Sequence, residues 1–170
     1  MLLSNYQKWR NACENYDAVG TITRDTLGMK NVSGSTSNIM ITSNNNVNNY
    51  SVMNLNRKFS NGIGVILSNT NTEGYDENTY VLGNNLNAWC SNLAVQYSSY
   101  SEDGKLVRVF TVSATNIIQN ASIKAVGITK PFYYDLSTSA QFLMGIYIPE
   151  TPIELTAEEG FSFAFKWTEE

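Results

Sequence analysis

The beginning of the chain has the residue spacing of an amphipathic helix. Four side chains recur at intervals of three, four and three residues, which places them along one stripe of a helix: Tyr6, Trp9, Cys13 and Tyr16. Ser4 precedes this stripe as a candidate N-cap, and Gln7 stands three residues later, where a capping box places Glu or Gln. The pattern predicts a short α-helix over about residues 5–14.

The aromatic stripe of this helix needs a surface to pack on, because a helix of this length is marginal in water by itself. That surface is either the sheet of the same chain or a neighbouring subunit, since terminal segments often act as arms in assemblies. We therefore treat Leu3, Tyr6, Trp9 and Tyr16 as candidate interface residues, with packing inside the chain as the alternative. On the interface hypothesis, Trp9→Ala disrupts assembly more than folding.

From Ala18 onward the pattern changes to short β-rich runs separated by Gly, Asn, Ser and Asp. The predicted strands cover residues 19–23, 38–42, 50–55, 63–67, 79–82, 122–129 and 141–148. Many short strands with turns between them and little helix predict an all-β fold, an antiparallel β-sandwich that is immunoglobulin-like or jelly-roll-like. We expect an N-terminal helical arm over residues 1–17 and a single β-sandwich domain over residues 18–170.

The clearest local prediction is a β-hairpin whose turn is formed by Asp103 and Gly104, a pair favoured in two-residue type I′ turns. Residues 92–100 and 105–114 flank this turn, and Glu102 then faces Lys105. One face pairs Tyr97 with Phe110, Val95 with Val112, and Leu93 with Ala114. The other face, which is mostly polar, pairs Tyr100 with Val107, Ser98 with Val109, Gln96 with Thr111, and Ala94 with Ser113. A single register therefore accounts for a core side, a solvent side and an opposite-charge pair.

The end of the chain alternates apolar and polar residues in the same way. Ile153 and Leu155 alternate with polar neighbours after two prolines, and an acidic turn follows. Then four aromatic residues share one face of a last strand: Phe161, Phe163, Phe165 and Trp167. An alternating aromatic face is typical of sandwich core, so we expect these side chains to point inward together with those of Tyr97 and Phe110.

Composition narrows the classes of function. With 170 residues and 42% hydrophobic residues, the chain can bury one substantial core. Its net charge is −4, and its basic residues are scattered apart from Arg57 and Lys58, so a nucleic-acid partner is not expected. The sequence shows neither a long apolar run nor a signal-peptide pattern, which predicts no membrane partner and a protein made in a cytoplasm.

Candidate chemistry is sparse. The sequence has no histidine, which removes Ser-His and Cys-His nucleophile pairs and histidine metal sites. The acidic clusters lie in predicted turns, where solvation explains them better than catalysis: residues 76–77, 102–103 and 158–159. Asp76 and Glu77 lack the spacing of a calcium loop. Cys13 and Cys90 are far apart in sequence and are expected to be reduced thiols. We predict no catalytic residue, no cofactor and no metal.

Trp89 stands beside Cys90 among asparagines, and the sequence leaves its role open. It is either the rim of the core or an exposed contact residue, so it joins the candidate interface residues. Together with the Tyr and Asn residues of the loops, it could also stack on and hydrogen-bond to sugars. A carbohydrate- or receptor-binding β-sandwich module is therefore the alternative to a structural protein, and a hydrolase with paired carboxylates ranks third.

The order of features in the second half resembles that of small virion structural proteins of tailed bacteriophages. The chain has a long hairpin, a strand with a Gly-apolar pair, a strand ending at prolines, an apolar-alternating strand, a Glu-Gly turn and a closing strand. These features correspond to residues 92–114, 126–128, 142–152, 153–155, 159–160 and 161–167. The start Leu3-Ser4-Asn5-Tyr6 is similar to particle proteins of crAss-like gut phages. Gly145 and Ile146 stand where such proteins often carry an arginine, which leaves the subfamily and the place in the particle open.

This resemblance implies a structural component of a phage virion that assembles as repeated copies. A neck or tail ring protein is slightly favoured over a capsid decoration. The implied partners are other virion proteins and copies of the chain itself, as a homo-oligomer in the particle. The implied localisation is the virion, after assembly in the host cytoplasm.

Overall fold

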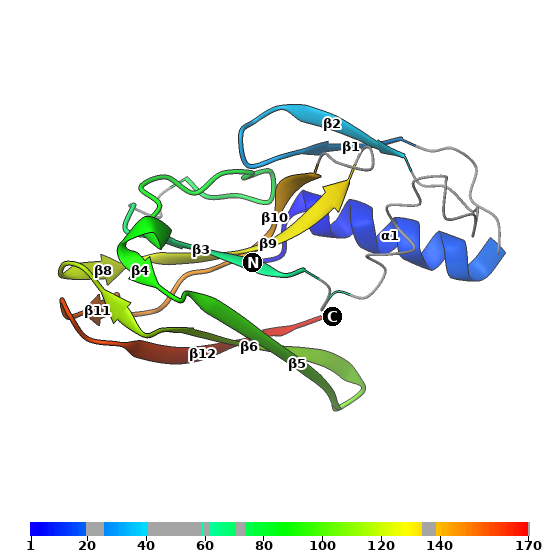
Figure 1. Ribbon diagram of the computed structural model, residues 1–170. Helices are drawn as coiled ribbons and strands as arrows, with labels where there is room; N and C mark the ends of the chain where they lie inside the picture. The colour runs from blue at the N-terminus through cyan, green and yellow to red at the C-terminus, as the bar shows by residue number, and fades with distance from the viewer. Residues whose placement is uncertain (20–25, 41–58, 60–61, 71–73, 134–138, 170) are drawn as a thin grey trace.

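The computed structural model describes the chain except for residues 20–25, 41–58, 60–61, 71–73, 134–138 and 170. It is mostly β-strand, with several small antiparallel sheets and one N-terminal helix (Figure 1). The helix is α1 (Ser4–Val19), and a 3₁₀ turn, η1, covers Asn87–Trp89. The strands are β1 (Thr26–Lys30), β2 (Thr36–Met40), β3 (Gly64–Ser68), β4 (Cys90–Ser91), β5 (Ala94–Glu102), β6 (Lys105–Ala114), β7 (Asn116–Ile117), β8 (Ala121–Ile123), β9 (Ala125–Tyr133), β10 (Ser139–Tyr147), β11 (Ile153–Leu155) and β12 (Phe161–Thr168).

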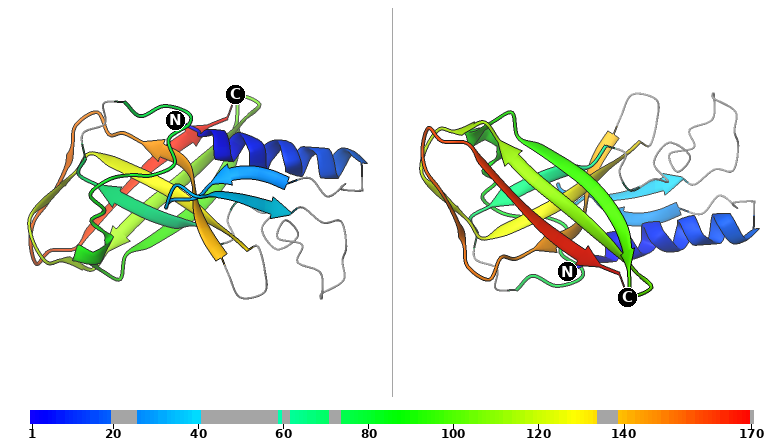
Figure 2. Two further views of the ribbon diagram at one scale, coloured as in Figure 1. Left: turned by 90° about the horizontal axis from the view of Figure 1, so that it is seen from above. Right: turned by 90° about the horizontal axis from the view of Figure 1, so that it is seen from below.

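Two three-stranded sheets form the body of the described structure. Their strand orders are β10-β9-β3 and β12-β6-β5, and three two-stranded sheets pair β1 with β2, β11 with β8, and β4 with β7. In Figure 1 the β12-β6-β5 sheet lies below the β10-β9-β3 sheet, and the two views of Figure 2 show their strands crossing at an angle. Sheets with one apolar face are stabilised when that face packs on another layer.

Aromatic side chains fill the space between these two sheets. Tyr147 on β10 stacks on Phe165 of β12, with ring centroids 4.5 Å apart, and Phe110 on β6 lies 5.2 Å from the same ring. Phe110 and Phe165 are buried, whereas Tyr97 and Phe163 are half-buried and pack against the core. The prediction that the late alternating segments turn their aromatic faces inward is therefore confirmed.

The β5–β6 hairpin has the predicted register. Asp103 and Gly104 both have positive φ angles, 52° and 76°, as a type I′ turn requires, and Glu102 pairs with Lys105. The ladder continues from this turn to Ala94, which pairs with Ser113. The predicted last pair is wrong, because Leu93 lies before β5 and the β5–β6 ladder ends at Ala94; on the other side of β6, Ala114 pairs with Phe161 of β12. Asn92 has a φ of 51°, and this left-handed residue turns the chain just before the ladder begins.

Other predicted strands are confirmed with shifted ends. Residues 63–67 correspond to β3 and 141–148 to β10, and residues 122–129 are divided between β8 and β9. The predicted segment 38–42 begins within β2, while its last two residues, segment 50–55 and residues 20–23 lie outside the described residues. Val19 belongs to α1, so it is not part of a strand.

The predicted strand over residues 79–82 is wrong. Asp76 forms a local turn here, because its side-chain Oδ1 accepts a hydrogen bond from the Asn78 amide, and its carbonyl accepts one from the Thr79 amide. Val81 is exposed, and only Leu82 of this run enters the core. Residues 79–82 therefore form a loop that Leu82 anchors in the core, and they do not form a strand.

The helix is longer than predicted and begins one residue earlier. The Leu3 carbonyl accepts a hydrogen bond from the Gln7 amide, so Leu3 takes the N-cap position that we expected for Ser4. The Ser4 amide instead donates to the carbonyl of Glu77, 2.7 Å away. The helix ends at Val19, two residues beyond the expected arm boundary at residue 17. Tertiary contacts, rather than a side-chain cap, thus fix its start.

Candidate functional site

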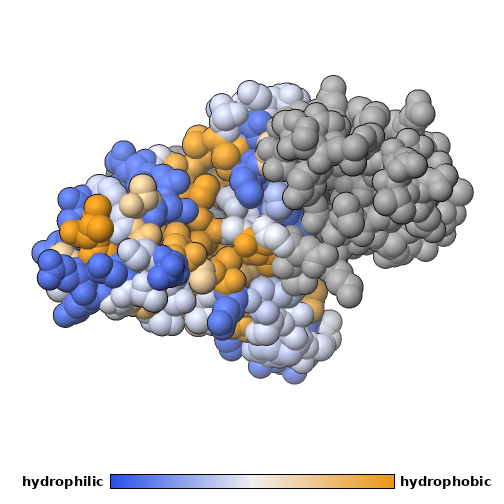
Figure 3. All heavy atoms as spheres, in the orientation of Figure 1, coloured by the Kyte–Doolittle hydropathy of each residue, from blue (hydrophilic) through white to orange (hydrophobic). Residues whose placement is uncertain are grey.

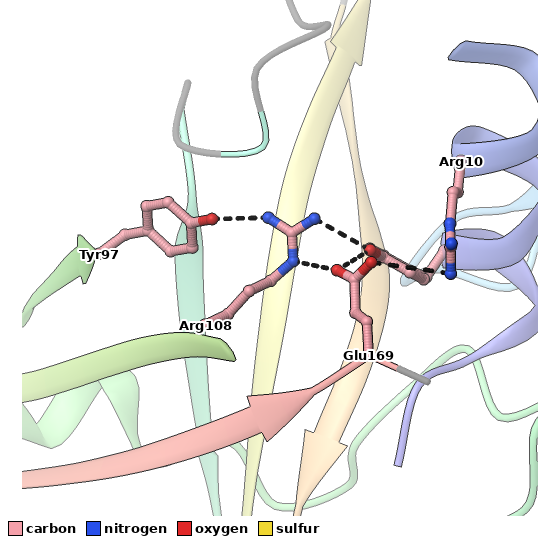
Figure 4. Close-up of polar contacts among 5 residues, drawn as sticks. Arg10, Tyr97, Arg108 and Glu169 are labelled. Carbon is pink, nitrogen blue, oxygen red and sulfur yellow. Dashed lines mark hydrogen bonds and ion pairs between the residues drawn. The ribbon is translucent and has the colours of Figure 1, made fainter. Parts of the chain in front are cut away.

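Two arginines, two tyrosines and a glutamate gather where α1, the β5–β6 hairpin and the end of β12 meet. We call this group the Arg108 cluster: Tyr6, Arg10, Tyr97, Arg108 and Glu169 (Figure 4). The helix supplies two of these residues, each strand of the hairpin supplies one, and Glu169 follows β12 directly. Register explains the position of Arg108, since its pairing with Ser99 places it on the same face of the hairpin as Phe110.

The guanidinium of Arg108 donates hydrogen bonds in three directions. Its Nε–H binds Glu169 Oε1, one terminal nitrogen donates to the Tyr97 hydroxyl at 2.6 Å, and the other donates to the Tyr6 hydroxyl at 3.1 Å. The Tyr6 hydroxyl in turn donates to Glu169 Oε1, and Arg10 Nη1 lies 3.7 Å from Glu169 Oε2. A buried ion pair needs such additional hydrogen bonds to offset its desolvation.

Aromatic rings surround the same guanidinium. Its Cζ atom lies 4.5 Å from the ring centroid of Phe59, 5.8 Å from that of Tyr6 and 5.9 Å from that of Tyr97. Ring faces attract cations, and this attraction strengthens when water is excluded. The fraction of Arg108 that remains exposed is 8%, and that of Glu169 is 7%.

Burial and hydrogen bonding shift two ionisation equilibria in the cluster. Burial, reinforced by the hydrogen bond to Glu169, raises the pKa of Tyr6 well above its ordinary value. Burial alone would lower the pKa of Arg108, but the neighbouring Tyr6 and Glu169 groups outweigh it and raise that pKa. Arg108 thus stays charged and Tyr6 stays protonated, and their polar atoms are engaged with each other. These hydrogen bonds join α1, the β5–β6 hairpin and the end of β12 to one another.

An open cavity of about 270 Å³ lies between the first turns of α1, the β1–β2 hairpin and residues 77–80. The two lysines that line the cavity, Lys8 and Lys30, already contact other groups of the chain. Lys8 Nζ donates to the Gly28 carbonyl at 2.6 Å, and Lys30 Nζ lies 4.8 Å from the ring centroid of Tyr80. Asn5 Nδ2 donates to the Lys30 carbonyl at 2.8 Å. Most of the lining residues have polar side chains, which suits a small hydrophilic group.

Two of the four edges of the three-stranded sheets are covered by the chain itself. Residues 1–3 lie along β10, where the Leu3 amide donates to the Met144 carbonyl and the Ile146 amide donates to the Met1 carbonyl. Along β3, the Asn87 side chain imitates a neighbouring strand, since its Oδ1 accepts from the Leu67 amide and its Nδ2 donates to the Val65 carbonyl. Covered edges of this kind cannot pair with another chain.

The outer edges of β5 and β12 make no backbone hydrogen bond outside their ladders in the described part of the chain. The two edges differ in how well they are protected against pairing with a strand of another chain. β12 carries Lys166 near its end, a type of residue that discourages strand pairing, and its Nζ donates to the Tyr100 hydroxyl of β5 at 2.9 Å. In contrast, β5 has nine residues with an unbroken register, no proline and one charge, Glu102 at its end. Among the residues that the structure describes, β5 thus has the least protected of the four edges.

The residues proposed for an interface lie mostly inside the chain. Leu3, Tyr6 and Trp9 are buried, and Tyr6 and Trp9 belong to the main core. For these three side chains the structure supports packing within the chain, because a buried side chain has no surface left for another subunit. Trp89 is half-buried and packs against the main core, as the rim of a core does. The side chains of Tyr16 and Cys13 lie outside the described residues.

Comparison with known proteins identifies no relative: no family model, no curated protein and no solved structure matches the chain. In the described residues no group of three or more Asp, Glu or Cys side chains gathers in a way that could hold a metal ion. None of the described helical segments combines the length and apolarity that crossing a membrane would take.

Sequence reasoning missed the Arg108 cluster, although the signal was present in the hairpin register. The predicted register pairs Tyr97 with Phe110 on the apolar face of the hairpin. The next pair on that face toward the turn is Ser99 with Arg108. An arginine on a core face needs a buried acceptor, which makes it a recognisable marker. The identity of that acceptor, Glu169, was not recoverable from local pattern, because the two residues are 61 positions apart.

Proposed function

We propose that this chain is a structural subunit without catalytic activity, built as a β-sandwich from its two three-stranded sheets, and that it assembles as repeated copies in a phage virion. The phage assignment rests on the order of features in the sequence described above. The observation that carries the assembly role is the long, unprotected edge of β5, because natural proteins usually cover such edges unless they pair with another chain.

The remaining surface supports the same proposal. Six large apolar side chains are exposed on the described chain: Met1, Val81, Tyr100, Leu106, Ile118 and Ile148. Figure 3 shows apolar residues reaching the surface in a band across one face of the molecule. Tyr100 and Leu106 lie close to the β5–β6 turn, next to the unprotected edge. Exposed apolar residues near one edge favour contact with a partner protein.

Light scattering coupled to size-exclusion chromatography tests this proposal on the purified full chain. We expect oligomers whose mass rises with concentration, and particles of defined size by electron microscopy when the other structural proteins of the same virion are added. A chain that stays monomeric over the whole concentration range and does not enter such particles contradicts the proposal.

A carbohydrate-binding module is the second candidate, and the polar cavity beside α1 is the observation that favours it. Tyr80 lines this cavity with several polar residues, which is a composition found in sugar sites. However, Lys30 Nζ already lies against the Tyr80 ring, where a sugar would have to stack. A glycan array decides between the two candidates: specific binding that Tyr80→Ala abolishes would establish the module.

A further inference from the structure

We propose that the occupant of the β5 edge is β5 of a second copy of this chain, paired antiparallel about a two-fold axis at Ser98. This inference rests on the proposed function and names the partner surface. It joins the two β12-β6-β5 sheets into one six-stranded sheet, an isologous contact of the kind that forms closed dimers.

The hairpin register determines which backbone groups of β5 point outward. Glu102 and Lys105 flank the two-residue turn, so they form a hydrogen-bonded pair. Hydrogen-bonded and non-bonded pairs alternate along an antiparallel ladder, so the even-numbered residues of β5 direct their amides and carbonyls toward β6. The odd-numbered residues therefore direct theirs to the open side: Val95, Tyr97, Ser99 and Ser101.

An antiparallel pairing centred on Ser98 satisfies all of these outward groups. It places Tyr97 opposite Ser99 of the second copy and Val95 opposite Ser101, with both residues of each pair on the open side of their strands. Each such pair exchanges two hydrogen bonds, which gives about eight along the seam. Moving the centre by one residue in either direction shortens the paired segment, so this register is the longest.

Charge also favours an antiparallel arrangement of two copies. The single charge on β5, Glu102, then lies opposite Ala94 of the other copy, whereas parallel pairing in register would bring two Glu102 residues together. The outward face pairs Gln96 with Tyr100, a polar residue with an exposed aromatic one. No like charges meet along the seam. A second copy thus complements the edge along its whole length.

A disulfide between copies tests the register. In the proposed pairing Ser98 faces its own counterpart in a non-hydrogen-bonded pair, where Cα atoms are about 4.5 Å apart, within the range for a disulfide. Under mild oxidation we expect Ser98→Cys to form a covalent dimer. Gln96→Cys is the matched control, because its two copies lie about 13 Å apart along the seam and cannot bond. The wild-type chain controls for its two native cysteines.

A charge substitution tests the energetics of the same contact. Ser98 is exposed, so Ser98→Lys should leave the monomer folded while placing two ammonium groups opposite each other in the dimer. We expect the dissociation constant measured by analytical ultracentrifugation to rise about fivefold. Ser162→Lys, at an exposed position on β12, should leave this constant unchanged.

The possible outcomes separate the two proposals. Covalent Ser98→Cys dimers together with a weakened Ser98→Lys dimer support the β5 seam. If the wild-type chain assembles but Ser98→Cys cross-links no better than Gln96→Cys, the β5 seam is wrong, for instance because β5 joins β12 of the next copy, and the assembly role stands. If the wild-type chain does not associate at all, both proposals are wrong.

Discussion

The Nε–H of Arg108 on β6 is hydrogen-bonded to Oε1 of Glu169, which follows β12, although 61 positions separate them in the sequence. The pair is buried, and the Tyr6 hydroxyl of α1 contacts both partners. One ion pair therefore connects the helix to the hairpin and to the last strand. Its energetic consequence follows from the cost of leaving a buried charge without its partner.

Replacing Arg108 by alanine should lower the free energy of unfolding by about 3–5 kcal/mol, because Glu169 then remains buried without its main cation. Urea denaturation measures this change. The double variant Arg108→Met, Glu169→Leu should recover part of the loss, since neither charge remains. Lys166→Ala is the control, because Lys166 is exposed and water screens its contact with Tyr100, so this variant should change the free energy of unfolding far less than Arg108→Ala. Equal effects at residues 108 and 166 would contradict a buried-charge explanation.

Trp9→Ala should now be a folding variant. Trp9 is 4% exposed and packs against Tyr6 and Phe59, with ring centroids 5.6 and 5.5 Å away. Removing a buried tryptophan leaves a cavity and costs about 3–5 kcal/mol. Thermal unfolding followed by circular dichroism measures the loss. An unchanged melting temperature with impaired assembly would instead support the original hypothesis that this side chain contacts another subunit.

Gly145→Ala should destabilise the fold by about 1–3 kcal/mol through overpacking. A Cβ atom at Gly145 would overlap the indole of Trp167, which is buried in the main core. Gly28→Ala on β1 is the matched control, because a Cβ atom there meets nothing within 4 Å. Parallel urea titrations should show a lower midpoint for the variant at residue 145 alone. Similar midpoints for both variants would indicate that the indole moves aside freely.

Stability should fall at alkaline pH in a manner that depends on Tyr6. The folded chain raises the pKa of this phenol above its ordinary value of about 10, so the contribution is fully present below that pH. As the pH rises past about 10, the unfolded chain releases the proton while the folded chain retains it, and the contribution is progressively lost. Tyr6→Phe should therefore lose less stability than the wild type as the pH rises from about 10 toward the raised pKa of the folded chain. Urea midpoints across this range measure the difference, and identical slopes would contradict it.

The hairpin could be predicted from sequence because its determinants are local. Asp103 and Gly104 fix the turn, and the alternation on either side fixes the faces, so nothing distant is required. The prediction failed at its far end, where the left-handed Asn92 turns the chain and Leu93 does not join the ladder; on the other side of β6, Ala114 pairs with Phe161 from a strand that begins 47 residues later. The position of a third strand depends on tertiary packing, which local alternation does not encode.

The candidate site was less predictable than the fold. An aromatic stripe at helical spacing is compatible with both a core and an interface, and only the burial of Tyr6 and Trp9 separates the two. The edges could not be ranked from sequence either. β3 is protected by a side chain from η1 and β10 by residues 1–3, and both contacts are long-range. Which strand keeps an uncovered edge therefore depends on the tertiary structure of the folded chain.

The carboxamide of Asn87 is, chemically, a peptide group detached from any backbone, and along β3 it completes the ladder with two bonds. Asn87→Ala would thus leave the Leu67 amide and the Val65 carbonyl on the β3 edge without these two bonds, while the Leu86 amide still donates to the Leu67 carbonyl. Chains with one open strand edge form dimers and stop, whereas chains with two open edges can keep adding neighbours. With the proposed β5 seam, the Asn87 side chain therefore helps to limit association to dimers by covering part of the β3 edge.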